Sequence, residues 1–346
     1  MQTVVTQLRE VEALPQPYLL FLGDTTQPGY AKTAFGLRDW ARVRCVGEYA
    51  CEGATVGTGL PFMTPVQARV AGARALVIGV ANPGGHIPAT WLPALLDALH
   101  AGLDLIGGMH ARLGAIESLR NAALVHGRRL IDVREPPAGL PVASGRKRSG
   151  RRLLTVGTDC ALGKKYTALS IVRALRERDI DADFRASGQT GILIAGGGMP
   201  MDAVVADFAA GAAEALSPDA GAEHWDVIEG QGSLSHPAYA GVSLALLHGS
   251  QPDVIVVCHE HGRERMLGHE HYAVPSLEET IDIALRLGAR TNPAIRCAGV
   301  SLNTGQLEEG AARLAIEEVG ARLGLPVADP MRGGGSFERL VDACLA

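Results

Sequence analysis

Short apolar runs alternate along the chain with stretches whose apolar residues repeat at helical spacing. Each run holds four to six residues and is bounded by glycine, proline or charged positions, which is typical of buried strands between helices. The predicted strands are Tyr18–Leu22, Arg44–Gly47, Ala75–Val80, Leu103–Gly107 and Arg129–Val133, followed by Leu153–Val156, Ala182–Arg185, Asp226–Glu229, Val254–Cys258 and Cys297–Leu302. This alternation predicts parallel sheets with helices on both faces, and therefore an α/β fold.

A segment rich in proline, glycine and charge separates the two sets of strands. Residues 134–150 read REPPAGLPVASGRKRSG and show no apolar periodicity. We therefore predict two doubly wound α/β domains, spanning about residues 1–140 and 150–346. One helix start is also clear, because Ser276 and Glu279 have the spacing of a capping box, and Gly288 is expected to end that helix.

The loop after the first strand of the second domain carries the strongest chemical signal. Residues 157–165 read GTDCALGKK between a predicted strand and a predicted helix, which is the layout of a phosphate-binding P-loop. Glycines let backbone N–H groups face an anion, the helix N-terminus adds partial positive charge, and Lys164 adds a full charge. We predict a phosphate-bearing ligand here, and the alternative is an ordinary glycine turn before a helix.

The predicted ligand-binding set is Gly157, Thr158, Asp159, Cys160, Gly163, Lys164, Lys165, Tyr166 and Thr167. Lys165 occupies the position of the usual magnesium-binding Ser or Thr, and the nearest hydroxyls belong to Tyr166 and Thr167. Cys160 lies near a helix N-terminus and two lysines, a setting that favours a thiolate. A covalent acyl-cysteine is one interpretation, but we interpret Cys160 as a small residue of the turn.

Other loops of the second domain follow the carboxyl ends of predicted strands, where doubly wound sheets bind ligands. Glu229 ends a strand within the sequence EGQG and is a candidate general base or metal ligand, or a cap for a neighbouring helix. Arg185 and Gln189 occupy a glycine-flanked turn that suits a carboxylate or phosphate, or that is simply solvated. Asn303 follows the last strand and is a further candidate for substrate binding.

A histidine-rich segment, HEHGRERMLGHEH at residues 259–271, follows the fourth strand of this domain. The His-x-His spacing suits zinc, but neither cysteine nor an HExxH pattern accompanies it, so we predict no metal. We predict a polar active-site loop, with His259 as a candidate base and Arg263 as a candidate carboxylate-binding group. A solvated loop is the alternative.

Polar clusters also mark strand ends in the first domain. They include Lys32 and His110, which are candidates for substrate binding or for structural roles such as helix caps. None of these clusters is a GxGxxG, so a dinucleotide site there has little support.

Composition narrows the classes of function. A net charge of −5 and 4% aromatic residues over 346 residues argue against a nucleic-acid partner. We see neither an apolar run of about 18 residues that would cross a membrane nor the pattern of a signal peptide. Six cysteines without C-x-x-C or framework spacing indicate a reduced, cytoplasmic protein. We expect a small-molecule substrate and a homo-oligomer.

Eight motifs occur in an order that covers nearly the whole chain. They are AKTAFGL from Ala31, GMH from Gly108, GTDCALGKK from Gly157, SGQTGILI from Ser187, DAVVADFAAGAAE from Asp202, EGQGSLSHPAY from Glu229, GVSLNT from Gly299 and DPMRGG from Asp329. Together they resemble the D-glutamate N-acetyltransferase family (DgcN type). The resemblance implies an N-terminal Rossmann-like domain and a C-terminal P-loop NTPase-like domain. It also implies acetyl-CoA-dependent N-acetylation of D-glutamate, or of a similar amino acid, in D-amino-acid catabolism.

This resemblance suggests roles for the candidate residues. Lys164, Lys165 and the loop N–H groups would hold the diphosphate of coenzyme A. Glu229 or His259 would take a proton from the substrate amine, and Lys164 or N–H groups would stabilise the oxyanion. The glutamate carboxylates would pair with Arg185 or Arg263.

The second domain alone is also similar to dethiobiotin synthetase. The shared features are a GTDxxxGK loop at Gly157–Lys164, a basic residue and glycine turn at Arg185–Gly188, and an EGxG strand end at Glu229–Gly232. This similarity implies an ATP-dependent ligase or kinase, with ATP and magnesium, as an alternative function. A nucleotide-binding regulatory protein is a third interpretation.

Overall fold

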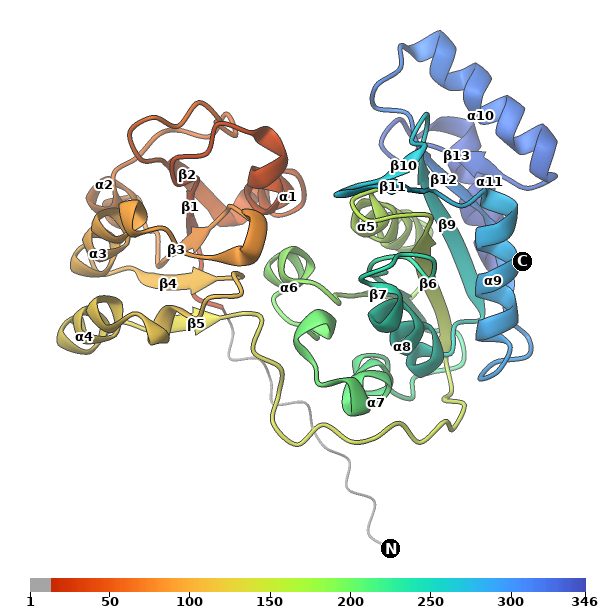
Figure 1. The fold of residues 1–346 in the computed structure, drawn as a ribbon, viewed down its shortest axis with the longest axis horizontal. Helices are drawn as coiled ribbons and strands as arrows, with labels where there is room; N and C mark the ends of the chain where they lie inside the picture. Colours follow the sequence, from red (N-terminus) through yellow and green to blue (C-terminus); the bar gives the residue numbers. More distant parts are fainter. Residues whose placement is uncertain (1–13) are drawn as a thin grey trace, which may run out of the picture. The chain divides into compact units, whose positions relative to one another are not determined.

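The computed structural model describes residues 14–346, which form two compact units (Figure 1). The first unit comprises the described chain up to Pro137 together with Gln189–Ala203, and the second comprises Ala138–Gly188 and Val204–Ala346. The sequence predicts two continuous domains, whereas the chain passes between the units three times. Segment 189–203 therefore folds with the N-terminal unit although it lies inside the C-terminal half of the sequence.

The first unit is built on a five-stranded, fully parallel sheet with the order β2-β1-β3-β4-β5. Its strands are β1 (Tyr18–Phe21), β2 (Cys45–Tyr49), β3 (Ala75–Ile78), β4 (Asp104–Gly107) and β5 (Leu130–Asp132). Its helices are α1 (Lys32–Trp40), α2 (Pro65–Val70), α3 (Leu92–His100), α4 (Glu117–His126) and α6 (Gln189–Ala195), with short 3-10 turns at Pro28–Ala31, Arg42–Arg44, Pro83–Gly85, Ala89–Trp91, Leu113–Ala115 and Met201–Ala203. The core joins β3 to α3 through fully buried side chains such as Leu76, Leu95 and Leu99.

The second unit is built on a six-stranded, fully parallel sheet with the order β13-β12-β9-β6-β8-β7. Its strands are β6 (Arg151–Gly157), β7 (Ala182–Arg185), β8 (Trp225–Ile228), β9 (Val254–Glu260), β12 (Arg296–Asn303) and β13 (Val327–Ala328). Its helices are α5 (Lys164–Arg176), α7 (Ala206–Leu216), α8 (Ala240–Ser250), α9 (Leu277–Gly288), α10 (Glu309–Leu323) and α11 (Gly334–Leu345). The α/β prediction is confirmed for both units.

Two segments differ from the sequence predictions. The histidine-rich segment contains an antiparallel hairpin of β10 (Arg265–Met266) and β11 (His269–Ala273), where a loop was expected. The turn expected around Gln189 is helix α6 from that residue onward, and Thr190 of α6 contacts Thr33 of α1 with hydroxyls 2.8 Å apart. Both α6 and α1 belong to the first unit.

The predicted start and end of α9 are confirmed. Ser276 accepts a hydrogen bond from the backbone N–H of Glu279, whose side chain accepts one from the N–H of Ser276, as a capping box requires. Gly288 is the last residue of the helix, and a Cβ there would come within 2.5 Å of the Ile295 side chain. Close packing therefore requires glycine at this end.

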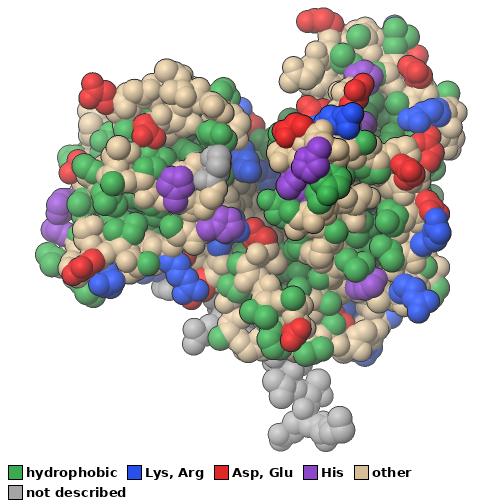
Figure 2. Space-filling model, viewed as in Figure 1, with side chains coloured by type: hydrophobic (Ala, Val, Ile, Leu, Met, Phe, Trp, Pro, Cys, Tyr) green, Lys and Arg blue, Asp and Glu red, His purple; other side chains and the backbone are tan. Residues whose placement is uncertain are grey.

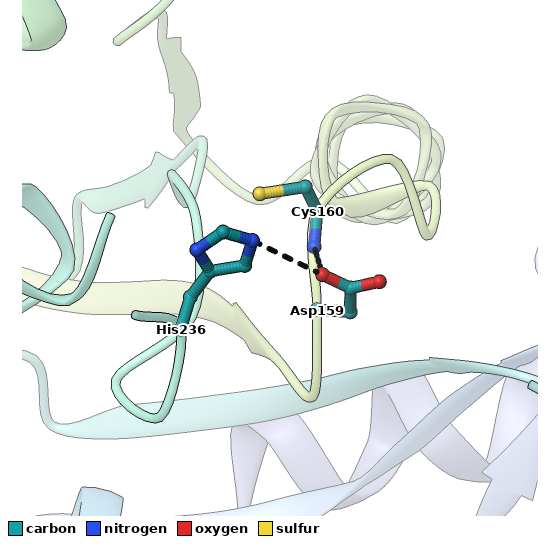
Figure 3. Close-up of side chains that lie close together, drawn as sticks. All are labelled: Asp159, Cys160 and His236. Carbon is teal, nitrogen blue, oxygen red and sulfur yellow. Dashed lines mark hydrogen bonds and ion pairs between the residues drawn. The ribbon is translucent and has the colours of Figure 1, made fainter. Parts of the chain in front are cut away.

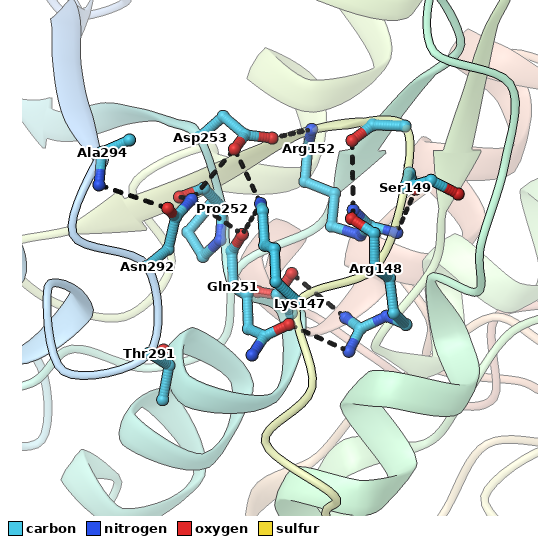
Figure 4. A network of polar contacts seen from close by, with 12 residues as sticks. Lys147, Arg148, Ser149, Arg152, Gln251, Pro252, Asp253, Thr291, Asn292 and Ala294 are labelled. Atoms are coloured by element: carbon cyan, nitrogen blue, oxygen red, sulfur yellow. Dashed lines mark hydrogen bonds and ion pairs between the residues drawn. The ribbon is translucent and has the colours of Figure 1, made fainter.

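Basic side chains just before β6 and at its start are anchored in the second unit (Figure 4). Arg152 is fully buried, and its guanidinium donates to the carbonyl oxygens of Ser149 at 2.9 Å and Pro218 at 2.8 Å. Lys147 Nζ donates to the Asp253 carboxylate at 2.7 Å. The last part of the predicted linker therefore belongs structurally to the sheet that follows it.

Side chains of both charge signs are interspersed over the face of the molecule drawn in Figure 2. This distribution agrees with the modest net charge of −5. Within residues 14–346, no helix has the length and apolar character needed to cross a membrane.

Candidate active site

The order of the strands in the second sheet brings the main candidate residues together. Strand β6 lies between β8 and β9, and all three run in the same direction. Their carboxyl ends therefore meet at one edge, where β6 leads into the P-loop, β8 leads to Glu229 and β9 carries His259. The site is assembled by parallel pairing rather than by proximity in sequence.

The P-loop connects β6 directly to the N-terminus of α5. Gly163 precedes the helix with φ of +105°, a conformation that favours glycine, and it has no side chain that could cap the helix. The N–H groups of the first turn therefore face the interior of the loop as an anion-binding surface. This geometry fits the loop predicted from GTDCALGKK.

Lys164 is buried within this loop. Its Nζ donates to the carbonyl oxygen of Asp159 at 2.6 Å, and burial lowers the pKa of the ammonium group. Gly157 and Gly230 make room for it, since a Cβ would lie 3.2 Å from Nζ at the first position and 3.1 Å from Cδ at the second. A Cβ on Gly230 would also come within 1.6 Å of the carbonyl oxygen of Thr155, so close packing against β6 requires glycine at this position.

Glu229 lies just beyond β8 and is buried. Its Oε2 accepts hydrogen bonds from the backbone N–H groups of Ser187 at 3.0 Å and Gly188 at 3.1 Å. Burial raises the pKa of the carboxyl, while Lys165 and the two N–H donors act in the opposite direction. A buried carboxyl beside a lysine-bearing loop can exchange a proton with a bound substrate.

His259 lies on the other side of the P-loop, near the end of β9. Its Nδ1 is 2.8 Å from the hydroxyl oxygen of Thr158. Burial, with a further contribution from Arg263, lowers the pKa of the imidazole to about 4. His259 is therefore neutral at pH 7.

Arg263 contacts the P-loop itself. Its guanidinium donates to Asp159 Oδ2 at 3.1 Å and to the carbonyl oxygen of Cys160 at 2.8 Å, and it pairs with Glu260. The backbone N–H of Leu267 also donates to Asp159 Oδ2, at 2.9 Å. The histidine-rich segment thus holds the loop in place.

A cavity of about 470 Å³ opens beside His259. Its lining combines apolar side chains such as Leu277 and Leu302 with two arginines, Arg263 and Arg322, and two glutamates, Glu264 and Glu318. An apolar wall with groups of both charges suits a small ligand that carries an ammonium group and carboxylates.

Other candidate residues have different surroundings. Arg185 pairs with Asp226 of the neighbouring strand, with Nε 2.5 Å from Oδ1, and also lies 3.4 Å from Asp183. Asn303 accepts a hydrogen bond from the N–H of Gly305 at 3.0 Å. These contacts engage both side chains within the second unit.

Three candidates belong to the first unit. Lys32 is exposed at the start of α1, and exposed His110 follows β4, where a Cβ on Gly85 would come within 2.3 Å of its ring. Gln189 begins α6, and its Oε1 accepts a hydrogen bond from Arg134 at 3.2 Å.

Thr167 carries one of the two hydroxyls that lie nearest to the usual magnesium-binding position in the sequence. Thr167 is buried, and its Oγ1 lies 2.7 Å from the hydroxyl of Ser301 on β12. This hydroxyl joins α5 to the sheet and does not face the loop. Lys165 therefore leaves the usual magnesium position without a Ser or Thr.

His236 is a site residue that sequence reasoning missed. It lies seven residues after Glu229 in the loop before α8, and its ring is buried within 4.8 Å of Asp159 and Cys160 ligand atoms (Figure 3). The only signal in the sequence was its place in a loop after a strand end, which does not specify where its side chain points.

Comparisons with known proteins agree with the geometry. Residues 141–341 match a family described as a domain of unknown function, DUF1611_C P-loop domain, and residues 43–136 match the DUF1611_N Rossmann-like domain. A crystal structure of a DUF1611 family protein from Anabaena variabilis is 35% identical, with a TM-score of 0.86 and coverage of 95% of this chain and 99% of that one.

Two curated relatives are each named D-glutamate N-acetyltransferase. The one from a Pseudoalteromonas species is 46% identical over 318 residues, covering 92% of this chain and 96% of the relative. The one from Tritonibacter scottomollicae is 50% identical over 330 residues, covering 95% of this chain and 98% of the relative. The family resemblance seen in the ordered motifs is confirmed.

Proposed function

The chain belongs to the DUF1611 family, and from that membership we propose that it is an N-acetyltransferase that moves an acetyl group from acetyl-CoA to the amine of D-glutamate. The observation that carries the proposal is the identity of 46% and 50% to two D-glutamate N-acetyltransferases over nearly the full length of each. The proposal includes the cytoplasmic location and the homo-oligomer expected from the sequence, which cell fractionation and light scattering test.

The P-loop is the proposed contact with acetyl-CoA. Two groups of this donor suit a loop lined with N–H groups and a buried lysine. One is the diphosphate, and the other is the thioester carbonyl oxygen, which becomes negatively charged during transfer. Lys164 and the N-terminus of α5 would stabilise either charge.

Glu229 is the proposed base for the amine. An ammonium group must lose a proton before its nitrogen can attack a carbonyl carbon. The pKa of the Glu229 carboxyl is raised, which increases its affinity for the proton that the ammonium group must lose. Its two backbone hydrogen bonds fix its position. Neutral His259, on the other side of the loop, is the second candidate.

The cavity beside His259 is the proposed place for the acceptor. Arg263 and Arg322 line it, and guanidinium groups bind carboxylates with two parallel hydrogen bonds. Glu264 and Glu318 line it too, so the cavity offers groups of both charges to the carboxylates and the ammonium group of D-glutamate. Arg263 would then both hold the loop and orient the acceptor.

The ATP-dependent ligase is the weaker alternative. P-loop enzymes that transfer phosphoryl groups use the hydroxyl after the loop lysine to bind Mg²⁺. Lys165 occupies that position, and the Thr167 hydroxyl contacts Ser301 in the interior. These positions favour a loop that binds an anion without hydrolysing ATP.

A turnover assay tests the function directly. We expect free coenzyme A and N-acetyl-D-glutamate to form in equal amounts from acetyl-CoA and D-glutamate, with no need for ATP and no inhibition by EDTA. Acetyl-CoA should raise the melting temperature of the protein, and Lys164→Ala should abolish that rise. Arg176→Ala, at the other end of α5, is the matched control and should respond as the unaltered protein does. Product formation that requires ATP and yields ADP in proportion would establish the ligase instead.

A further inference from the structure

Asp159, Cys160 and His236 form a side-chain cluster at the edge of the P-loop (Figure 3). Asp159 and Cys160 belong to the loop between β6 and α5, and His236 reaches them from the loop that follows β8. One ligand atom from each residue lies within 4.8 Å of the others. Half-buried Cys160 is therefore next to the N-terminus of a thirteen-residue helix, to Lys164 and to an imidazole.

The imidazole of His236 has one nitrogen in use and one without a partner. Nδ1 accepts a hydrogen bond from the backbone N–H of Ala238 at 3.1 Å, so the proton of the neutral ring resides on Nε2. The His236 side chain is fully buried, and Nε2 has no hydrogen-bond partner among the residues that the structure describes. A buried donor of this kind requires an explanation, because native proteins rarely leave one unmatched.

Asp159 does not satisfy this donor. Its Oδ1 lies 3.7 Å from Nε2, which is longer than a hydrogen bond, and already accepts from the N–H of Cys160 at 2.6 Å. Its Oδ2 accepts from Arg263 and Leu267. The Nε2–H group therefore lies in the same cluster as the Cys160 sulfur, with its hydrogen-bonding capacity unused.

We propose, on the basis of the acetyl transfer proposed above, that Cys160 accepts the acetyl group from acetyl-CoA and passes it to the amine, with His236 as a positioning residue. A thiolate is the nucleophilic form of cysteine, and it is favoured beside helix N-termini, lysines and N–H donors. The N–H groups of α5 and Lys164, which belong to the same loop, stabilise the oxyanion at the attacked carbonyl.

The transfer balances without any further reactant. In the first half, the Cys160 sulfur bonds to the acetyl carbon, the bond from that carbon to the sulfur of coenzyme A breaks, and the thiol proton leaves on that sulfur. In the second half, the amine nitrogen bonds to the acetyl carbon and the bond to Cys160 breaks. One proton from the nitrogen then returns to the cysteine sulfur.

This inference specifies which end of acetyl-CoA meets the P-loop. The thioester and the diphosphate lie at opposite ends of the pantetheine arm, so one loop cannot hold both groups of a single molecule. With Cys160 as acceptor, the loop meets the thioester, and the diphosphate binds elsewhere. This replaces the sequence-based expectation that Lys164 and Lys165 hold the diphosphate.

A metal ion fits the same cluster less well. A metal on Nε2 would move the ring proton to Nδ1, where it would oppose the N–H of Ala238. Both Asp159 oxygens already accept hydrogen bonds, one of them from a guanidinium. Tight, stoichiometric Zn²⁺ binding that is lost in His236→Asn would overturn the thiol assignment.

Mass spectrometry of the full-length protein tests the acetyl-cysteine. After acetyl-CoA is added without an amine and the reaction is quenched in acid, we expect one acetyl group per chain, located on Cys160 by peptide mapping. D-Glutamate should then discharge it. Cys160→Ala should neither label nor transfer, whereas Cys297→Ala, a half-buried cysteine on β12, should label as the unaltered protein does.

The role of His236 needs a readout that a purely structural residue would not change. His236→Asn keeps an acceptor near Nδ1 and removes the donor at Nε2, while His236→Gln places an amide donor near Nε2. We expect the asparagine variant to acetylate Cys160 at least tenfold more slowly at an unchanged melting temperature, and the glutamine variant to recover part of the rate. Equal acetylation rates in all three proteins would remove His236 from the mechanism.

The outcomes separate this inference from the proposed function. Acetylation of D-glutamate by both the unaltered protein and Cys160→Ala, without a labelled cysteine, would uphold the function and overturn the acetyl-cysteine. Label on Cys160 that D-glutamate fails to discharge would uphold the cysteine and overturn the acceptor. If Cys160 is not labelled and no N-acetyl-D-glutamate forms, both the acetyl-cysteine and the proposed function are overturned. Because labelling is measured on the unaltered protein, the result does not depend on whether the alanine variant folds.

Discussion

At the scale of single residues, burial acts in opposite directions on the two side chains that flank the P-loop. It raises the pKa of the Glu229 carboxyl and lowers the pKa of the His259 imidazole to about 4. In both cases the low-dielectric surroundings disfavour the charged form. Each group therefore affects stability and activity with its own dependence on pH.

His259 should make the protein sensitive to acid. Its folded pKa of about 4 lies below the ordinary value of 6.5, so the unfolded chain binds the proton more readily between these values. Stability from this residue is complete above about pH 6.5 and is lost as the pH falls towards 4, by at most about 3 kcal/mol. Urea unfolding of the unaltered protein and of His259→Gln should show a smaller loss in the variant. If the free energy of unfolding falls by the same amount with pH in both proteins, His259 is not the source of the acid sensitivity.

Glu229→Gln should separate catalysis from stability. The glutamine oxygen can still accept from Ser187 and Gly188, but a base is lost, so kcat should fall by about 10²–10⁴-fold. Because the folded pKa of Glu229 is raised, the buried charge costs stability increasingly as the pH rises above 4.5. The variant should therefore melt no lower than the unaltered protein, with an advantage that grows with pH. A near-normal kcat with a lower melting temperature would assign Glu229 a structural role.

Some site residues are predictable because a topological rule locates them. Lys164, Glu229 and His259 each follow a strand that the apolar pattern reveals, and parallel strands bring such positions together. His236 lies farther along a loop, and its position depends on the path of that loop, which no periodicity encodes. Arg185 ends a strand as predicted, but the charge of Asp226 on the next strand orients its side chain, and this pairing depends on strand order.

At the scale of elements, the polar network around the start of β6 is a clear case of buried charge with a structural function (Figure 4). Arg152 points into the interior and Arg151, its neighbour on the strand, points outwards to Glu223. Alternation along a strand places the two guanidinium groups on opposite faces. Arginine therefore satisfies buried carbonyl groups at position 152 and forms an exposed ion pair at position 151.

Arg152→Met should destabilise the second unit strongly. It leaves the carbonyl oxygens of Ser149 and Pro218 without their donors in the interior, which costs about 3 kcal/mol or more. Arg151→Ala removes an exposed ion pair and a cation–π contact with Trp225, and should cost about 1 kcal/mol. Urea unfolding of both variants measures the difference, and similar losses would show that the buried network contributes little.

The helices and strands that sequence reasoning found are those with long or fully apolar patterns. The ten predicted strands all occur, with ends that differ from the prediction by at most two residues. The missed elements are short or atypical: β13 has two residues, and the β10–β11 hairpin has too many charged and histidine side chains to alternate. Helix α6 has seven residues with a glycine at its third position, and it is stabilised by packing against α1 rather than by its own propensity.

At the scale of the whole molecule, the chain builds two parallel sheets but does not divide between them at a single point. Thr190 and Ile194 of α6 contact Thr33 and Arg44 of the first unit, through distances of 2.8 and 2.9 Å. The sequence pattern shows where α/β units occur, but a pattern cannot assign a helix to one of two sheets. That assignment comes from contacts between residues 150 and 157 positions apart.

A fragment of residues 138–346 should therefore aggregate more readily than the full chain. It retains α6 without the helix against which Thr190–Ile194 are buried, so it exposes an apolar surface. We expect it to bind a hydrophobic dye and to aggregate at concentrations where the full chain is soluble. Replacing 189–203 with a glycine-serine linker should reduce both effects. A fragment that melts cooperatively without binding dye would show that α6 does not need its partner.

The passage of segment 189–203 into the N-terminal unit also limits how genes for such proteins can recombine. A single genetic exchange near codon 138 would join one parent's α1 to the other parent's α6, and their buried hydroxyls and side chains would no longer be matched. Only an exchange with three crossover points, which carries 189–203 together with the first 137 codons, preserves the packing. The two halves of this protein are therefore expected to be inherited together, and chimaeras built from relatives should be designed with three junctions instead of one.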